Sequence, residues 1–116
     1  MSKVLVIPDS HLKIEVIERG LRLAQKVRAD YAICLGDYFD DWGSFPFQYH
    51  QMVDYLKKTM RYNPDLILLL GNHELSYLGH HCSGYKPEVA KELYEFLHDN
   101  YRFNLSYAID GVLYSH

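Results

Sequence analysis

The chain has 116 residues, of which 48% are hydrophobic and 23% are charged, and its formal net charge is −3. This length and composition predict one globular domain of an ordinary soluble protein. Because its net charge is negative, the chain lacks the strong electrostatic attraction to nucleic acid that a basic protein has. Bound divalent cations would reverse the sign of the charge locally.

Neither a membrane segment nor an export signal is expected. The strongest apolar run, Leu66–Leu70, is far shorter than the roughly 20 residues that a membrane-spanning helix requires. The first predicted strand begins close to Met1, which leaves no room for a signal peptide. Cys34 is expected to be a small buried thiol and Cys82 lies in a predicted loop, with no C-x-x-C pair for a zinc site. We therefore expect a reducing, cytoplasmic location.

The N-terminal part predicts a βαβ unit. Lys3–Ile7 carries a continuous apolar run, which is typical of a strand buried on both faces of a parallel sheet. Apolar residues at helical spacing then predict an amphipathic helix over Ile14–Arg28. Tyr31–Leu35 is the next strand, and a right-handed crossover should join the two strands in parallel.

The C-terminal part predicts two more helices and an antiparallel hairpin. A helix is expected over Phe47–Arg61, a strand over Asp65–Leu70 and a helix from Pro87 to Asn100. Alternating apolar and polar residues predict one half-buried strand over Phe103–Ile109. Asp110-Gly111 is typical of a type I′ turn, after which Val112–Ser115 would return antiparallel.

Three polar clusters directly follow the three apolar strands. They are Asp9-Ser10-His11, Gly36-Asp37-Tyr38-Phe39-Asp40 and Gly71-Asn72-His73-Glu74. Because an open α/β sheet binds its ligands at the carboxyl ends of its strands, the clusters should share one crevice. Carboxylates, imidazoles and an amide oxygen are ligands for hard or borderline divalent metals, so the clusters indicate a metal site.

Two aspartates from different strand ends can hold two cations if one carboxylate bridges them, as in sites that perform in-line displacement. Asp37 ends the middle strand and is the natural bridge, with Asp9 and His11 on one side and Asn72 on the other. Each cluster alone would be an ordinary turn or loop. Their common position after strands is what favours a shared metal site.

In order and spacing, the clusters resemble the D-x-H, G-D-x-x-D and G-N-H-E signatures of the calcineurin-like metallophosphoesterases. The resemblance implies an α/β sandwich with a parallel βαβ portion and an antiparallel hairpin. It also implies hydrolysis of phosphomonoesters or phosphodiesters by a hydroxide that bridges two divalent ions (Mn, Fe, Zn or Ni). In the family, Asp9, His11 and Asp37 would bind one ion, and Asp37 and Asn72 the other.

Three neighbouring residues have expected roles as well, and the resemblance implies those of His73 and Asp40 only. His73 would be the catalytic group that stabilises the phosphate or protonates the leaving oxygen. Asp40 would orient a neighbouring group rather than bind metal. Glu74 would hold its loop through hydrogen bonds to the backbone.

The later motifs of the family are matched only in part. Tyr114-Ser115-His116 resembles the fourth motif, so His116 would bind the second metal, whereas the fifth motif, G-H-x-H, is absent. We therefore expect residues 1–116 to be a metallophosphoesterase domain truncated at its C-terminal end. Two alternatives are that Gly79-His80-His81 supplies the missing ligands, or that a second chain completes the site in a homo-oligomer.

An aromatic segment follows the second cluster and has two interpretations. It comprises Tyr38, Phe39, Trp42, Phe45, Phe47 and Tyr49. These rings could form a stacking wall for a nucleobase or an aromatic ester. They could equally pack on the core or in an oligomer contact.

The expected function is hydrolysis of a phosphate ester, and the sequence leaves a nucleotide, a phosphoprotein and a nucleic-acid end open as substrates. The alternative function is a non-catalytic scaffold of the same fold, or an inactive fragment, that binds protein partners. A dinucleotide-binding protein is disfavoured, because no G-x-G-x-x-G follows the first strand.

Overall fold

The computed structural model describes residues 1–79, 84–100 and 102–116. His80, His81 and Cys82 therefore lie outside the described residues, and with them the suggestion that Gly79-His80-His81 supplies metal ligands. In the part of the chain that is described, no helix combines the length and the apolar character needed to cross a membrane.

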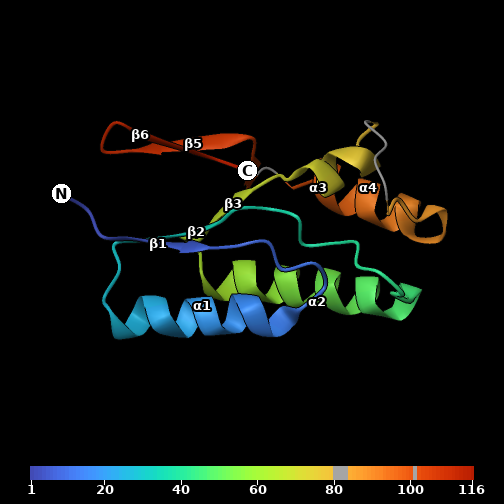
Figure 1. The fold of residues 1–116 in the computed structure, drawn as a ribbon, viewed down its shortest axis with the longest axis horizontal. Coiled ribbons are helices and arrows are strands. Elements are labelled where there is room, and N and C mark those ends of the chain that lie inside the picture. The colour runs from blue at the N-terminus through green and yellow to red at the C-terminus, as the bar shows by residue number, and fades with distance from the viewer. Residues whose placement is uncertain (80–83, 101) are drawn as a thin grey trace.

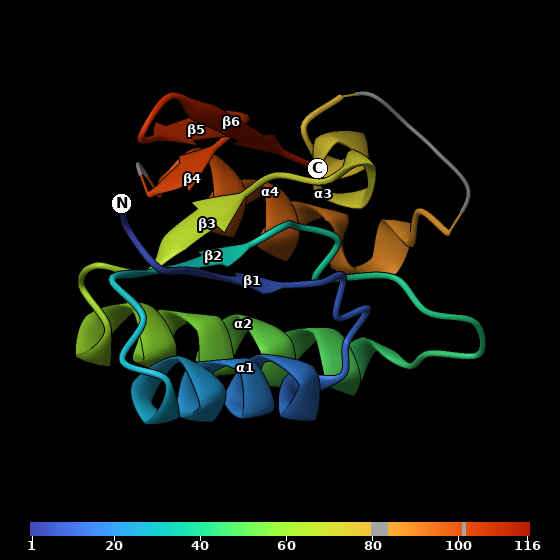
Figure 2. The same ribbon diagram turned by 60° about the vertical axis from the view of Figure 1, so that its left-hand side comes forward.

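A four-stranded parallel sheet forms the centre of the fold, in the order β1-β2-β3-β4. Its strands are β1 (Val4–Ile7), β2 (Tyr31–Cys34), β3 (Ile67–Leu69) and β4 (Phe103–Asn104). The predicted parallel βαβ unit is confirmed, with Val4 opposite Tyr31 and Ile7 opposite Cys34 in the register. Because β1, β2 and β3 are direct neighbours, their carboxyl ends lie side by side at one edge of the sheet (Figure 2).

The two long helices cover one face of this sheet (Figure 1). The long helices are α1 (Ile14–Lys26) and α2 (Pro46–Tyr62), followed by α3 (Asn72–Tyr77), the 3₁₀ turn η1 (Pro87–Val89) and α4 (Ala90–His98). Helix α1 ends before the predicted limit, because Arg28 has a left-handed backbone with φ of 55°. Pro46 starts α2 at a position where its missing N–H costs no hydrogen bond.

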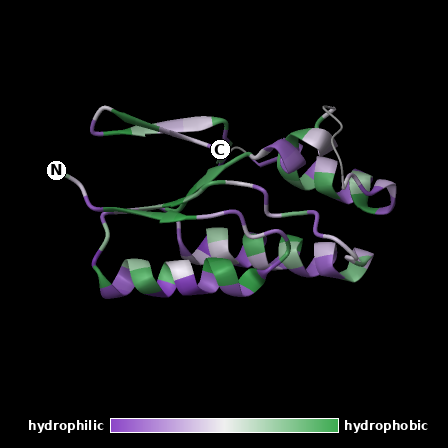
Figure 3. Ribbon diagram, viewed as in Figure 1, coloured by the Kyte–Doolittle hydropathy of each residue, from purple (hydrophilic) through white to green (hydrophobic). Residues whose placement is uncertain are grey.

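The main core lies between the sheet and these helices. Side chains of the sheet, such as Ile7, Cys34 and Leu68, meet buried residues of α1, α2 and α4, such as Ile17, Leu56 and Leu93. Figure 3 shows the corresponding pattern, with hydrophobic strands and helices that are hydrophilic on part of their surface. The free Cys34 is buried here, as expected from the sequence.

An antiparallel hairpin lies on the other face of the sheet. It consists of β5 (Ser106–Ile109) and β6 (Val112–Ser115), which pair alone as a second sheet. Ile109 packs in a small cluster with Ile33, Ile67 and Leu69 of the parallel sheet. Asp110 and Gly111 both have positive φ, at 52° and 78°, as the predicted type I′ turn requires.

The single strand predicted over Phe103–Ile109 is wrong. Phe103 and Asn104 pair with β3 in the parallel sheet, whereas Ser106–Ile109 pairs with β6. Leu105 lies between the two segments and is 64% exposed, although the alternation placed it on a buried face. The backbone of this segment forms its hydrogen bonds with two different strands, β3 and β6. These hydrogen bonds outweigh the alternation of apolar and polar residues in deciding where the strand is divided.

Candidate metal centre

Three predicted ligands from separate parts of the chain meet beyond the ends of the strands. Ligand atoms of Asp9, Asp37 and His116 all lie within 4.8 Å of one another. Asp9 follows β1, Asp37 follows β2 and His116 follows β6. The hairpin therefore delivers the last residue of the chain to the edge where the parallel strands end.

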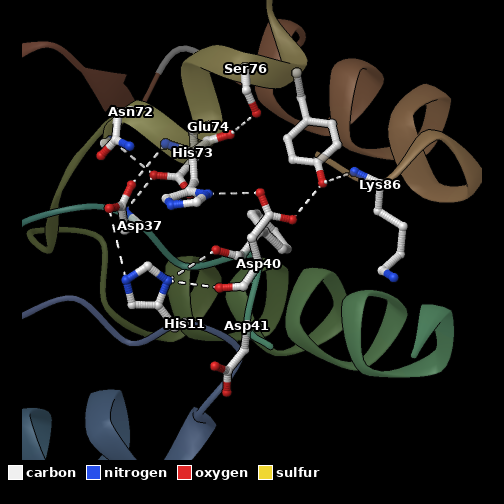
Figure 4. Close-up of polar contacts among 12 residues, drawn as sticks. His11, Asp37, Asp40, Asp41, Asn72, His73, Glu74, Ser76 and Lys86 are labelled. Carbon is white, nitrogen blue, oxygen red and sulfur yellow. Dashed lines mark hydrogen bonds and ion pairs between the residues drawn. The ribbon is translucent and has the colours of Figure 1, made fainter. Parts of the chain in front are cut away.

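The ring of His11 is oriented by the backbone. Its Nδ1 lies 2.8 Å from the carbonyl oxygen of Asp40, which can only accept a hydrogen bond. With the proton on Nδ1, the lone pair of Nε2 faces Asp9 Oδ2 and Asp37 Oδ2, each at 3.9 Å. Figure 4 shows this ring held between Asp37 and Asp40. Metal-binding histidines characteristically hold the other ring nitrogen in this way.

His116 repeats the same arrangement. Its Nδ1 lies 2.9 Å from the carbonyl oxygen of Leu35. Its Nε2 lies 3.0 Å from Asn72 Oδ1 and 3.1 Å from Asp37 Oδ2. Asn72 Oδ1 and Asp37 Oδ2 therefore both approach Nε2, while Nδ1 donates its proton to the Leu35 carbonyl. Such a cluster of acceptors calls for positive charge between them, which a divalent cation would supply.

Asp37 occupies the centre of the group. It is 4% exposed, and its Oδ1 accepts the backbone N–H of His73 at 2.9 Å. This bond leaves Oδ2 facing the Nε2 atoms of both His11 and His116. The carboxylate thus lies between two potential ligand sets, as a bridging ligand must.

Glu74 ties the second and third clusters together. It is fully buried, and its carboxylate accepts the backbone N–H groups of Asp37 at 2.6 Å, Tyr38 at 2.9 Å and Gly71 at 2.9 Å. Burial raises the pKa of Glu74 to about 8, while these three amides stabilise the charged form and oppose the increase. The predicted role of Glu74 in holding its loop by backbone hydrogen bonds is confirmed.

The close approach of two loops explains both glycines of these clusters. Gly36 has φ of +104°, and a Cβ added there would lie 2.4 Å from the backbone nitrogen of Gly71. A Cβ on Gly71 would lie 2.1 Å from Asp37 Oδ1. Any side chain at either position would therefore displace the central carboxylate or the backbone beside it.

Asp40 orients His73 from the side opposite the candidate ligands. His73 Nδ1 donates to Asp40 Oδ2 at 2.9 Å, and the other oxygen of Asp40 accepts the hydroxyls of Tyr49 and Tyr77, each at 2.6 Å. Neither contact was predicted from the sequence, where Tyr49 belongs only to the aromatic segment and Tyr77 was not singled out. Tyr77 lies four residues after His73 in α3, so helical spacing would have placed it on the same face.

Backbone strain is concentrated in the same group. His11, Asp37 and Asp40 have left-handed conformations with φ of 42°, 53° and 69°. Conformations of this kind cost roughly 1–3 kcal/mol each and persist where the surroundings enforce them. The hydrogen bond from His11 N to the carbonyl of Asp37, at 2.8 Å, is one such restraint.

A family model for calcineurin-like phosphoesterases matches residues 2–116. The chain belongs to this family. No curated protein and no solved structure matches this chain. The parallel sheet with a separate antiparallel hairpin agrees with part of a calcineurin-like fold. Family membership implies a phosphate-ester hydrolase that uses divalent metal ions.

The fold thus brings all seven predicted site residues to one edge of the sheet. Each of the seven contacts at least one other member of the set, which comprises Asp9, His11, Asp37, Asp40, Asn72, His73 and His116. The ring of His73 lies next to that of His11, with centroids 5.3 Å apart. Their chemical roles stay predictions.

The aromatic segment divides into buried and exposed rings. Tyr38, Phe39 and Tyr49 are buried in the core, as the packing interpretation predicts. Trp42, Phe45 and Phe47 are exposed, with Trp42 94% exposed. A cavity of about 190 Å³ beside Trp42 is lined by His11, Asp40, Asp41, Trp42, His73 and Gly84.

A larger hollow of about 800 Å³ lies at the opposite, amino end of the strands. Arg102 lines it, but its guanidinium donates to the backbone carbonyls of Met60, Asn63 and Leu66. This arginine stabilises the end of α2 and is not directed to a ligand.

Proposed function

We propose that this protein hydrolyses phosphomonoesters or phosphodiesters at a dinuclear metal centre built around Asp37. The observation that carries the proposal is the orientation of His11 and His116. Both rings use Nδ1 to bond a backbone carbonyl and direct Nε2 toward Asp37. Membership of the calcineurin-like family supports the reaction class.

The residues present fit two divalent ions. Asp9 and His11 would hold one, Asn72 and His116 the other, and Asp37 would serve both. Oxygen and imidazole donors suit Mn, Fe, Zn or Ni. When bound, such ions polarise phosphoryl oxygens and lower the pKa of a coordinated water.

The charges around the site support a role for cations. Asp9, Asp37, Asp40 and Asp41 all lie near it, and Lys13 is engaged with Asp41, with Nζ 3.2 Å from Oδ2. A phosphate anion would be repelled by this group of carboxylates. Divalent ions would reverse the local sign and allow it to bind.

His73 is the residue we assign to proton transfer. Asp40 fixes its Nδ1 and leaves the ring edge-on to His11, beside the candidate ligands. From this position the imidazole would stabilise the phosphate or give a proton to the leaving oxygen. Tyr49 and Tyr77 hold Asp40, so they would fix the direction of the ring as well.

The proposal includes a reducing cytoplasmic setting, which suits the free, buried thiol of Cys34. That residues 1–116 form an incomplete domain, and that a second copy completes the site, stay predictions.

The test is hydrolysis of a generic aryl phosphate by the purified chain with Mn²⁺ added after treatment with EDTA. The proposal predicts phosphate release that needs the added metal. A folded chain that binds Mn²⁺ without hydrolysing any phosphate ester would favour the scaffold function instead. Hydrolysis that persists at full rate in EDTA would contradict the metal centre.

A further inference from the structure

The cavity beside the candidate metal centre has an unusual rim. It holds about 190 Å³ and adjoins His11 and His73, so it opens on the place where the proposed reaction would occur. Pockets that enclose drug-sized ligands measure about 300–1,000 Å³. The space beside His73 is therefore suited to one small group of a substrate, such as a single ring system.

Trp42 stands on this rim with 94% of its side chain exposed. An indole is among the largest apolar groups of a protein, and leaving it in water forgoes the stabilisation that burial would give. The loop itself is anchored, because Asp41 accepts the backbone N–H of Trp42 at 2.9 Å and pairs with Lys13 at 3.2 Å. The backbone at Trp42 is thus held in place while its ring has few protein neighbours.

The cavity suits a neutral ring better than an anion. Its described lining includes the acidic residues Asp40 and Asp41 and contains no lysine or arginine. A phosphoryl group would bind on the side of Asp37, where metal ions would lie. The part of the substrate beside Trp42 is then the organic group that the phosphate esterifies.

We propose that Trp42 stacks on the base of a nucleoside monophosphate and makes this class the preferred substrate. The inference rests on the proposed phosphoesterase function. Water supplies the new P–O bond, the P–O5′ bond breaks, and O5′ takes a proton, giving a nucleoside and inorganic phosphate. Stacking of one base on an aromatic side chain changes affinity by about tenfold or more, so the effect is measurable.

Intrinsic fluorescence tests the contact directly, because Trp42 is the only tryptophan in the sequence. The full chain at a fixed Mn²⁺ concentration is titrated with AMP and with ribose 5-phosphate, which share the same phosphate ester and differ in the base. Excitation at the red edge of the indole band avoids adenine absorption. We expect saturable quenching by AMP and none by ribose 5-phosphate. Equal responses to both compounds would overturn the proposal.

Kinetics supply the second readout. We expect Trp42→Ala to lower the ratio of kcat/KM for AMP to kcat/KM for ribose 5-phosphate by about tenfold. Trp42→Phe should restore most of the ratio, since a phenyl ring still stacks. Phe47→Ala removes another exposed ring of the same segment and should leave the ratio unchanged. An unchanged ratio in Trp42→Ala would overturn the subsite while the proposed function stands.

Two further outcomes separate the hypotheses. If the wild-type chain hydrolyses neither compound, the proposed function fails, and the fluorescence titration still decides whether Trp42 contacts the base. If Trp42→Ala converts an oligomer into a monomer in size-exclusion chromatography, the ring belongs to a subunit contact and the subsite is overturned.

Discussion

The two faces of the parallel sheet are covered very differently. On the helix side, residues of β1, β2 and β3 pack into a large core with α1, α2 and α4. On the hairpin side, Ile109 meets a small cluster of Ile33, Ile67 and Leu69. Val6 on the sheet is 43% exposed and Leu113 on the hairpin is 69% exposed.

This difference divides the candidate site into two parts. Asp37 lies in the loop after β2, whereas Asn72 and His73 begin α3, and the buried Glu74 links these two segments beside the main core. His116 depends instead on the thinly packed hairpin. We infer that the part of the site at the strand ends is rigid and that His116 is the ligand most easily lost.

The largest effect is expected at the centre of the rigid part. Asp37→Asn keeps the shape of the side chain but removes the charge that would serve both ions. Hydrolysis of an aryl phosphate with Mn²⁺ should fall by at least about a hundredfold, since even indirect supports of a metal ligand contribute 10–100-fold. Asp54→Asn on the exposed surface of α2 is the control and should keep the wild-type rate. A wild-type rate for Asp37→Asn would remove this residue from the mechanism.

A smaller but broader effect is expected from Glu74→Gln. Both oxygens of Glu74 accept hydrogen bonds from backbone N–H groups. In the glutamine one of these oxygens is replaced by an NH₂ group, which cannot accept such a hydrogen bond. Denaturant unfolding should show a loss of about 1–3 kcal/mol. Affinity for Mn²⁺ should fall by about 10–100-fold. Glu18→Gln on the exposed face of α1 should change neither quantity, and equal values for both variants would show that Glu74 does not hold the site.

The packing on the hairpin side of the sheet can be tested by Ile109→Ala. Loss of this contact should speed hydrogen exchange of the amides in β5 and β6 by about tenfold or more, because the hairpin opens locally. Amides of α2 should keep their protection. Leu113→Ala removes an exposed side chain of the same hairpin and should have little effect. Faster exchange in α2 after Ile109→Ala would show that the two faces unfold together.

The smallest effect concerns Cys34 in the main core. Burial raises the pKa of its thiol to about 12, so iodoacetamide should label it only after unfolding, which mass spectrometry of its peptide would reveal. The stability that the neutral thiol contributes is fully present below the unfolded pKa of about 8.5 and is lost as the pH rises toward the folded value. Rapid labelling of the native chain at neutral pH would contradict a tightly packed helix side.

The sequence predicted which residues gather at the strand ends better than it predicted the pairing of Phe103–Ile109. Asp9, Asp37 and Asn72 follow neighbouring parallel strands, and the position of a strand end is set by local pattern. The division of Phe103–Ile109 at Leu105 depends on which strands pair with each part of this segment. The alternation of apolar and polar residues does not indicate the partner strand. The hydroxyls of Tyr49 and Tyr77 on Asp40 are likewise tertiary contacts, although the spacing of Tyr77 from His73 gave a usable signal.

A calorimetric titration of the metal-free chain with Mn²⁺ tests whether the strand ends form a metal centre. We expect binding at micromolar concentrations that is lost in Asp37→Asn and kept in Asp54→Asn, with circular dichroism unchanged in all three chains. A folded wild-type chain that releases no heat of binding at these concentrations would contradict a metal centre at the strand ends.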